Sequence, residues 1–252
     1  MRRLSFLLFL FCLLGVGAAG AQSASFTIAQ HGHQVGTASF TFTPAQQGYS
    51  SASVVHVTMQ GLNYALSKTE RLTPANHLKH VELSATINGS AVTVVVTPGN
   101  GKVLLNTSAN GQNTTTDLPP HAASVFLPDF DPGALQTLLA LAMEQNSRDL
   151  WAIIPKGKAS VVPVQLATYA DLHGTLNGKP VTVHHLEATI RIANQGEKTE
   201  LFSGPENQLL QAELPQEGFA LVRKGFVLQP PSKAPSPPPQ PQTPPTQQPP
   251  QS

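Results

Sequence analysis

Apolar and polar residues alternate at every second position over long stretches between residues 22 and 229. In residues 80–87, for example, the odd-numbered positions from Val81 to Ile87 are apolar and the even-numbered positions are polar. Because successive side chains of a β-strand point to opposite faces, this period predicts strands with one buried face. The runs with this pattern are residues 26–30, 35–43, 49–59, 62–72, 80–87, 92–97, 102–107, 162–172, 181–193, 209–214 and 219–228.

Turn sequences lie beside these runs. Asn88-Gly89, Asn110-Gly111 and Asn177-Gly178 suit the positive-φ positions of tight hairpins, and Gly99-Asn100-Gly101 supplies a fourth turn. Successive hairpins predict an antiparallel meander rather than a parallel sheet covered by helices. The run 162–172 is long for a strand, which predicts a strongly curved sheet.

One run changes parity in its middle. Val181 and Val183 share a face, whereas the apolar residues from Leu186 to Ile192 fall on the opposite parity. We expect a β-bulge at His184-His185, because one extra residue would return all of them to a single buried face.

One segment breaks the alternation altogether. Asp131-Pro132 provides a helix N-cap and a first-turn proline, and apolar residues at helical spacing follow as far as residue 146. We therefore expect an α-helix over residues 132–146 that is apolar nearly all round and needs cover on more than one side. The sequence thus predicts a mainly β fold, in which one long curved antiparallel sheet, a half barrel, wraps one central helix. The groove between sheet and helix is expected to be lined by Leu135, Leu138, Leu139, Leu141, Met143 and Trp151.

The N-terminus has the pattern of a secretory signal. Arg2-Arg3 precede an apolar run over residues 4–16, and small residues up to Ala21 predict cleavage before Gln22. The run is shorter than the roughly 20 residues that cross a bilayer, so we expect no membrane span. The single cysteine, Cys12, lies inside the signal, so the exported chain would hold no disulfide. We expect a protein of the periplasm or the extracellular space.

The chain divides into three parts by composition. Residues 1–21 are the predicted signal peptide, residues 22–229 are expected to form a single antiparallel β domain, and residues 230–252 are a proline-rich tail. The tail lacks aromatic and large aliphatic residues, so it cannot build a core and is expected to be disordered, as a solvated spacer or a docking strand.

Charge excludes one class of partner. Without Arg2 and Arg3 the fifteen Lys and Arg fall to thirteen, against fourteen Asp and Glu, so no basic field remains. Nucleic-acid binding draws on clustered Lys and Arg, and the sequence gives it no support.

Candidate catalytic and metal-binding patterns are weak. Nine histidines are present, but no HExxH or CxxC pair sets them at the spacing of a zinc site, and no GxSxG elbow marks a serine nucleophile. Pairs of carboxylates can act as glycosidase residues, but Asp131 is better explained as a helix cap than as a partner of Asp129. Glu70 and Glu82 are likewise better explained as ordinary strand charges than as a catalytic pair. We therefore predict no catalytic residue, no metal and no cofactor, and expect the protein not to be an enzyme.

Three segments carry a family resemblance. These are residues 26–40, Lys68-Thr69-Glu70-Arg71-Leu72, and residues 214–226. The chain resembles secreted bacterial β-rich domains of unknown function that are compared with the outer-membrane lipoprotein carrier and receptor proteins. The resemblance implies a long antiparallel sheet curled into a half barrel around helical segments, with an apolar hollow that in the carriers accepts acyl chains.

Two functional hypotheses remain open from the sequence. The first is a non-enzymatic exported protein, periplasmic in a Gram-negative host, that binds a lipid, an acylated protein or another apolar ligand in the groove. The second is a structural or interaction module of the cell envelope, which uses the proline-rich tail as a spacer or to dock an envelope protein.

Overall fold

The computed structural model describes residues 21–144, 149–192 and 195–230. The predicted signal peptide, apart from residue 21, and the predicted tail beyond residue 230 lie outside the described residues. Within the described ranges a 17-stranded sheet surrounds a single α-helix. The strands are β1 (Gln22–Gln30), β2 (His33–Ala45), β3 (Gly48–Met59), β4 (Leu62–Leu72), β5 (Leu78–Ile87), β6 (Ser90–Gly99), β7 (Lys102–Ala109), β8 (Gln112–Leu118), β9 (Ala123–Phe126), β10 (Leu150–Ile154), β11 (Ser160–Thr168), β12 (Leu172–Leu176), β13 (Lys179–Ile192), β14 (Gln195–Ser203), β15 (Leu209–Leu214), β16 (Phe219–Arg223) and β17 (Phe226–Leu228); the helix is α1 (Pro132–Glu144), and a 3-10 turn, η1, spans Pro205–Asn207.

Strands β1 to β8 form the predicted meander. Each pairs antiparallel with the next, and Asn88, Asn100 and Asn110 hold positive φ values of 51° in the turns between them. Asparagine followed by glycine tolerates this left-handed backbone, so the turn chemistry fixes the hairpins where the sequence predicted them.

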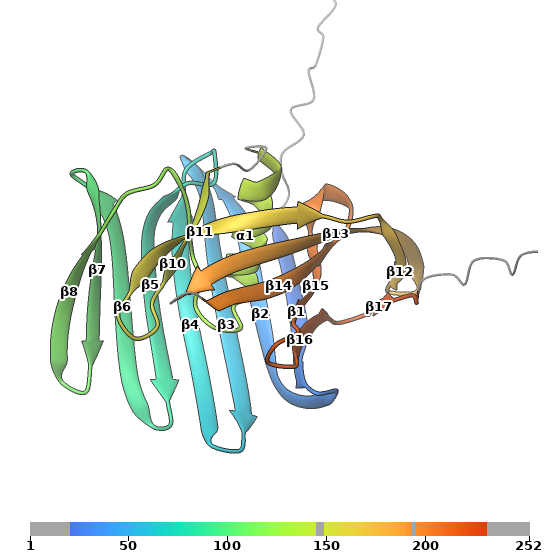
Figure 1. The fold of residues 1–252 in the computed structure, drawn as a ribbon, viewed down its shortest axis with the longest axis horizontal. Coiled ribbons are helices and arrows are strands. Elements are labelled where there is room, and N and C mark those ends of the chain that lie inside the picture. Colours follow the sequence, from blue (N-terminus) through green and yellow to red (C-terminus); the bar gives the residue numbers. More distant parts are fainter. Residues whose placement is uncertain (1–20, 145–148, 193–194, 231–252) are drawn as a thin grey trace, which may run out of the picture.

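The sheet continues from β1 into the second half of the chain. β1 pairs with β16 on the side opposite β2, and the ladder then runs through β15, β14, β13 and β11 to β10. Figure 1 shows β11, β13 and β14 crossing the view over the long strands of the meander, as expected for a sheet that curls back on itself. The curled sheet is not closed into a barrel.

One pairing departs from the meander. β10 pairs parallel with β9, whereas every other ladder between described strands is antiparallel. A parallel partner requires a crossover, and α1 is the element that joins β9 to β10.

Helix α1 lies inside the curled sheet, as the sequence predicted. It contacts β2 and β3 on one side and β9 and β15 on others, and every residue from Pro132 to Leu139 is buried. Leu138 and Leu141 are fully buried in the same core cluster as β-strand residues from both halves of the chain. A helix with an apolar surface nearly all round therefore obtains its cover from one sheet.

The predicted bulge at His184-His185 is wrong. β13 pairs with β14 from His184 to Ile192 without a shift of register. Val183 instead joins a second, small core with Phe202, Leu210 and Phe226, while Leu186 faces the main core. The parity changes because the two halves of one strand bury opposite faces.

No helix in the described part of the chain has the length and hydropathy needed to span a bilayer.

Candidate functional site

Strand β4 carries charged side chains into the core. Tyr64, Leu66, Lys68, Glu70 and Leu72 occupy alternate positions and are all buried, with Lys68 and Glu70 each 1% exposed. Because side chains alternate between the faces of a strand, the parity that buries the leucines also buries the two charges. The prediction that Glu70 is an ordinary strand charge is therefore wrong, although Glu82 is exposed as expected.

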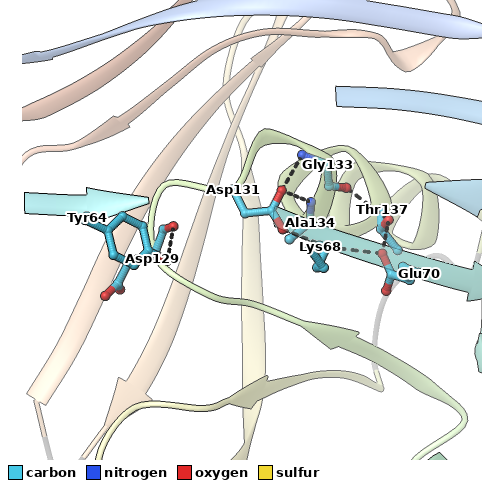
Figure 2. Close-up of polar contacts among 8 residues, drawn as sticks. All are labelled: Tyr64, Lys68, Glu70, Asp129, Asp131, Gly133, Ala134 and Thr137. Carbon is cyan, nitrogen blue, oxygen red and sulfur yellow. Dashed lines mark hydrogen bonds and ion pairs between the residues drawn. The ribbon is translucent and has the colours of Figure 1, made fainter. Parts of the chain in front are cut away.

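The buried charges fasten the helix to the sheet (Figure 2). Lys68 Nζ lies 2.7 Å from Asp131 Oδ2 and 3.3 Å from Glu70 Oε2. Asp131 Oδ1 accepts hydrogen bonds from the backbone N–H groups of Gly133 (2.9 Å) and Ala134 (3.2 Å), which confirms the predicted N-cap. One carboxylate thus caps α1 and neutralises a lysine on β4.

Burial sets the protonation of this cluster. Loss of solvation raises the pKa of Glu70 above its ordinary value, even though the Lys68 ammonium opposes the rise. Burial alone would lower the pKa of Lys68, but the carboxylates of Asp131 and Glu70 raise it. The cluster therefore favours the charged form of Lys68 and a Glu70 carboxyl group that holds its proton more tightly than usual.

Several polar atoms of the cluster have few partners. Thr137 Oγ1 lies 3.4 Å from Glu70 Oε2 and donates to the Gly133 carbonyl at 3.1 Å. Ser51 Oγ, Ser53 Oγ and Glu70 Oε1 are buried without a hydrogen-bond partner among the described residues. Buried polar atoms without a partner destabilise the folded state, so these atoms reduce stability beside the N-terminus of α1.

An apolar cavity of about 460 Å³ lies next to the cluster. Its walls come from both halves of the chain: the ends of β3–β5, the β9–α1 loop, and β13–β16. Asp131 and Tyr64 also line it. The walls are formed by Met59, Leu62, Tyr64, Ile87, Leu127, Pro128, Asp129, Phe130, Asp131, Leu135, Ile154, Lys156, Ile190, Glu197, Lys198, Thr199, Leu214, Gln216, Glu217, Phe219 and Leu221.

Three aromatic rings gather on the cavity wall. The rings of Tyr64 and Phe130 lie 6.2 Å apart, and those of Phe130 and Phe219 lie 4.8 Å apart, both edge to face. Phe130 has a φ of 58°, which is a rare conformation for a residue with a side chain. Tyr64 Oη donates to the Asp129 carbonyl at 3.5 Å, and burial, followed by the nearby Asp129 and Asp131 carboxylates, raises the Tyr64 pKa. The phenol therefore stays neutral on the cavity wall.

A second hollow of about 120 Å³ lies beside the cavity. It shares Leu127 and Ile154 with the first and adds apolar residues of β5 and β6, among them Leu83 and Val94. The β9–α1 loop therefore borders both hollows.

The six residues that the sequence placed in a groove have different surroundings. Leu135 lines the cavity, whereas Leu138, Leu139 and Leu141 are packed in the core. Met143 is 54% exposed and borders a separate hollow at the other end of α1. Trp151 is half-buried, stacks on His121 at 3.5 Å and donates from Nε1 to Asp149.

Sequence reasoning missed Lys68, Glu70 and most of the cavity wall. One signal could have revealed the cluster: Lys68 and Glu70 share the parity of Leu66 and Leu72, so a strict alternation already buries them. The cavity wall had no such signal, because its residues come from strand ends and loops that the fold brings together.

Three of the nine histidines each lie beside one carboxylate. His80 contacts Glu82, His184 contacts Asp171, and His185 contacts Glu200, each through one nitrogen. The part of the chain that the structure describes holds no group of three or more His, Cys, Asp and Glu side chains arranged to bind a metal ion.

Comparisons with known proteins bear on the fold. No protein-family model matches the sequence, and no curated protein sequence does. The structure is similar to the crystal structure of a β-barrel-like protein of the domain of unknown function DUF1849 from Brucella abortus, with a TM-score of 0.55 and 10% sequence identity. The match covers 82% of this chain and 97% of that chain. At this identity the likeness is one of fold, and it agrees with the expected resemblance to β-rich domains of unknown function but does not extend to the lipoprotein carriers.

Proposed function

We propose that this protein is a non-enzymatic, exported protein that holds a lipid or another apolar ligand in the cavity between its sheet and the β9–α1 loop. The observation that carries the proposal is the cavity itself, which has a volume of about 460 Å³, is mostly apolar, and shares wall residues with a second hollow of about 120 Å³. Ligand pockets are typically of roughly 300–1,000 Å³ and have mainly apolar walls with a few polar groups.

Two further features support this proposal. The signal-like N-terminus supports export, to the periplasm in a Gram-negative host. The sequence resembles β-rich domains that are compared with lipoprotein carriers, and because the hollow of those carriers accepts acyl chains, a lipid or an acylated protein is the ligand we propose. Among the six residues first expected to line the site, the proposal keeps Leu135 and replaces the others by the cavity wall described above.

A cavity-filling variant tests the proposal. Leu127 lines both hollows, so Leu127→Trp would occupy the space a ligand needs. We expect the parent protein to bind an uncharged fluorescent apolar probe, with saturation near one probe molecule per chain, and the variant to bind it at least about tenfold more weakly, a loss of about 1.4 kcal/mol.

The matched control is Val54→Trp. Val54 is 42% exposed on β3 and lies outside both hollows, so the same indole on this surface should leave binding unchanged. Thermal unfolding of all three proteins checks that each is folded. A parent protein that ignores the probe and carries no co-purifying lipid by native mass spectrometry would overturn the proposal.

A further inference from the structure

We define the rim of the cavity as Asp129, Lys156, Glu197, Lys198 and Glu217. These charged side chains surround an apolar interior. They would contact the head group of a bound amphiphile, so the inference below rests on the proposed function.

Both lysines of the rim are already paired. Lys156 Nζ lies 3.3 Å from Asp129 Oδ1, and Lys198 Nζ lies 3.1 Å from the Glu187 carboxylate just outside the cavity wall. Glu197 and Glu217 form no ion pair with any residue in the described ranges. The rim is therefore left with negative charge.

The two free carboxylates are held on the same side of the opening. Gln216 Oε1 accepts from the Lys198 backbone N–H at 3.2 Å, and Gln216 Nε2 donates to the Gly196 carbonyl at 3.3 Å. These bonds fasten the β15–β16 turn, which carries Glu217, to the start of β14, which carries Glu197. Although burial opposes the effect, the carboxylates of Asp129, Glu217 and Glu197 together raise the pKa of Lys156.

Aromatic rings adjoin this negative rim. Phe130 directly follows Asp129, Phe219 lies two residues after Glu217, and both rings line the cavity with Tyr64. Aromatic faces attract cations, and clusters of such rings recognise quaternary ammonium groups. A cleft with walls of low polarity also concentrates the field of the carboxylates at its mouth.

We propose that the cavity selects amphiphiles whose head group carries a quaternary ammonium, with the apolar chain in the cavity and the ammonium at Glu197, Glu217 and the aromatic rings. Amphiphiles with a purely anionic head group are disfavoured, because the lysines that would attract them are neutralised by Asp129 and Glu187.

Three probes with one dodecyl chain test the selectivity. Dodecyltrimethylammonium, dodecyl maltoside and dodecanoate would each displace a fluorescent apolar probe from the full chain, at low salt and below the concentrations at which they form micelles. We expect dodecyltrimethylammonium to bind about tenfold more tightly than dodecanoate, with the maltoside between them, and the ratio to shrink as salt rises.

A double variant assigns the effect to the rim. Glu197→Gln with Glu217→Gln should reduce the ratio of the two affinities to about twofold or less. Glu82→Gln with Asp117→Asn changes net charge by the same amount at exposed positions outside the cavity, so it should keep the ratio of the parent protein.

The outcomes separate this inference from the proposed function. Equal affinities, tighter binding of dodecanoate, or a ratio that survives the rim variant would overturn the selectivity while leaving an apolar site in place. Failure of all three probes to displace the reporter, or of the reporter to bind, would overturn both.

Discussion

Lys68, Glu70 and Asp131 are the residues on which the junction of helix and sheet depends. Lys68 Nζ lies 2.7 Å from the Asp131 carboxylate and 3.3 Å from that of Glu70, and the side chains of all three are 0% exposed. A buried ion pair seldom adds much stability over an apolar pair of the same shape, but removing one member leaves the other charge buried and alone. The intact cluster therefore adds little net stability, whereas the loss of one member is costly.

Removal of the lysine should be severe. We expect Lys68→Met to lower the free energy of unfolding by about 3–5 kcal/mol, because Asp131 would stay buried without a counter-charge. Urea denaturation followed by circular dichroism measures the change. Lys102→Met is the control: Lys102 pairs with Asp117 at the surface, so its loss should cost at most about 1 kcal/mol. Equal effects of the two substitutions would contradict the buried role of Lys68.

The Glu70→Gln variant should become more stable relative to the parent protein as pH rises. Burial raises the pKa of Glu70 in the folded protein above the unfolded value of 4.5, so folding is favoured while the carboxyl is protonated and loses that stability as pH rises through the folded pKa. Glutamine never ionises, and its amide can donate toward Ser51, which pairs with residue 70 across β3 and β4. We therefore expect the stability of Glu70→Gln relative to the parent to increase from pH 4.5 to pH 8, measured by urea denaturation at each pH. A relative stability that falls over this range would show that Glu70 is ionised and usefully paired.

At the scale of elements, the N-terminus of α1 is set tightly against β3. A methyl group on Gly133 would overlap Ser53 Oγ and lie 3.0 Å from Ser51 Oγ. Alanine normally stabilises a helix relative to glycine, by about 1 kcal/mol. Because of this overlap, we expect alanine at position 133 to lower the free energy of unfolding rather than to raise it.

We expect Gly133→Ala to destabilise the protein by about 1–3 kcal/mol, the usual range for overpacking. Ser53→Ala removes the overlapping oxygen, so the double variant should recover much of the loss. A double-mutant cycle by thermal unfolding measures the coupling between the two sites. Additive effects would mean that α1 does not approach β3 as closely as described.

The elements were predictable to the extent that local chemistry determines them. Asp131-Pro132 located the helix start, and the Asn-Gly pairs located hairpins, because caps and turns act over a few residues. The parallel pairing of β9 with β10 and the double role of β13 were not predictable, because they depend on which distant strand supplies a partner. The buried Lys68 was visible in the alternation of β4, but its partner Asp131 lies 63 positions away and only the fold joins them.

At the scale of the whole molecule, the cavity exists because the sheet curls without closing. The meander and the β13–β16 half meet through β1 and β16, and the β9–α1 loop enters between them with Phe130 in a rare backbone conformation. The apolar wall therefore draws on residues from Met59 to Leu221, while the core beneath it is filled by the chain's own helix. The packed interior and the cavity are therefore separate parts of this fold.

Backbone NMR of the full chain, titrated with dodecyl maltoside below its micelle concentration, tests most directly whether the cavity is the binding site. We predict that the largest saturable shifts fall on amides of the cavity wall, in residues 127–135, 154–156 and 214–221, and that the outer face around Val54 and the hollow near Met143 are little affected. Shifts that are spread over the outer face, or centred on Met143, would contradict a ligand site between the sheet and the β9–α1 loop.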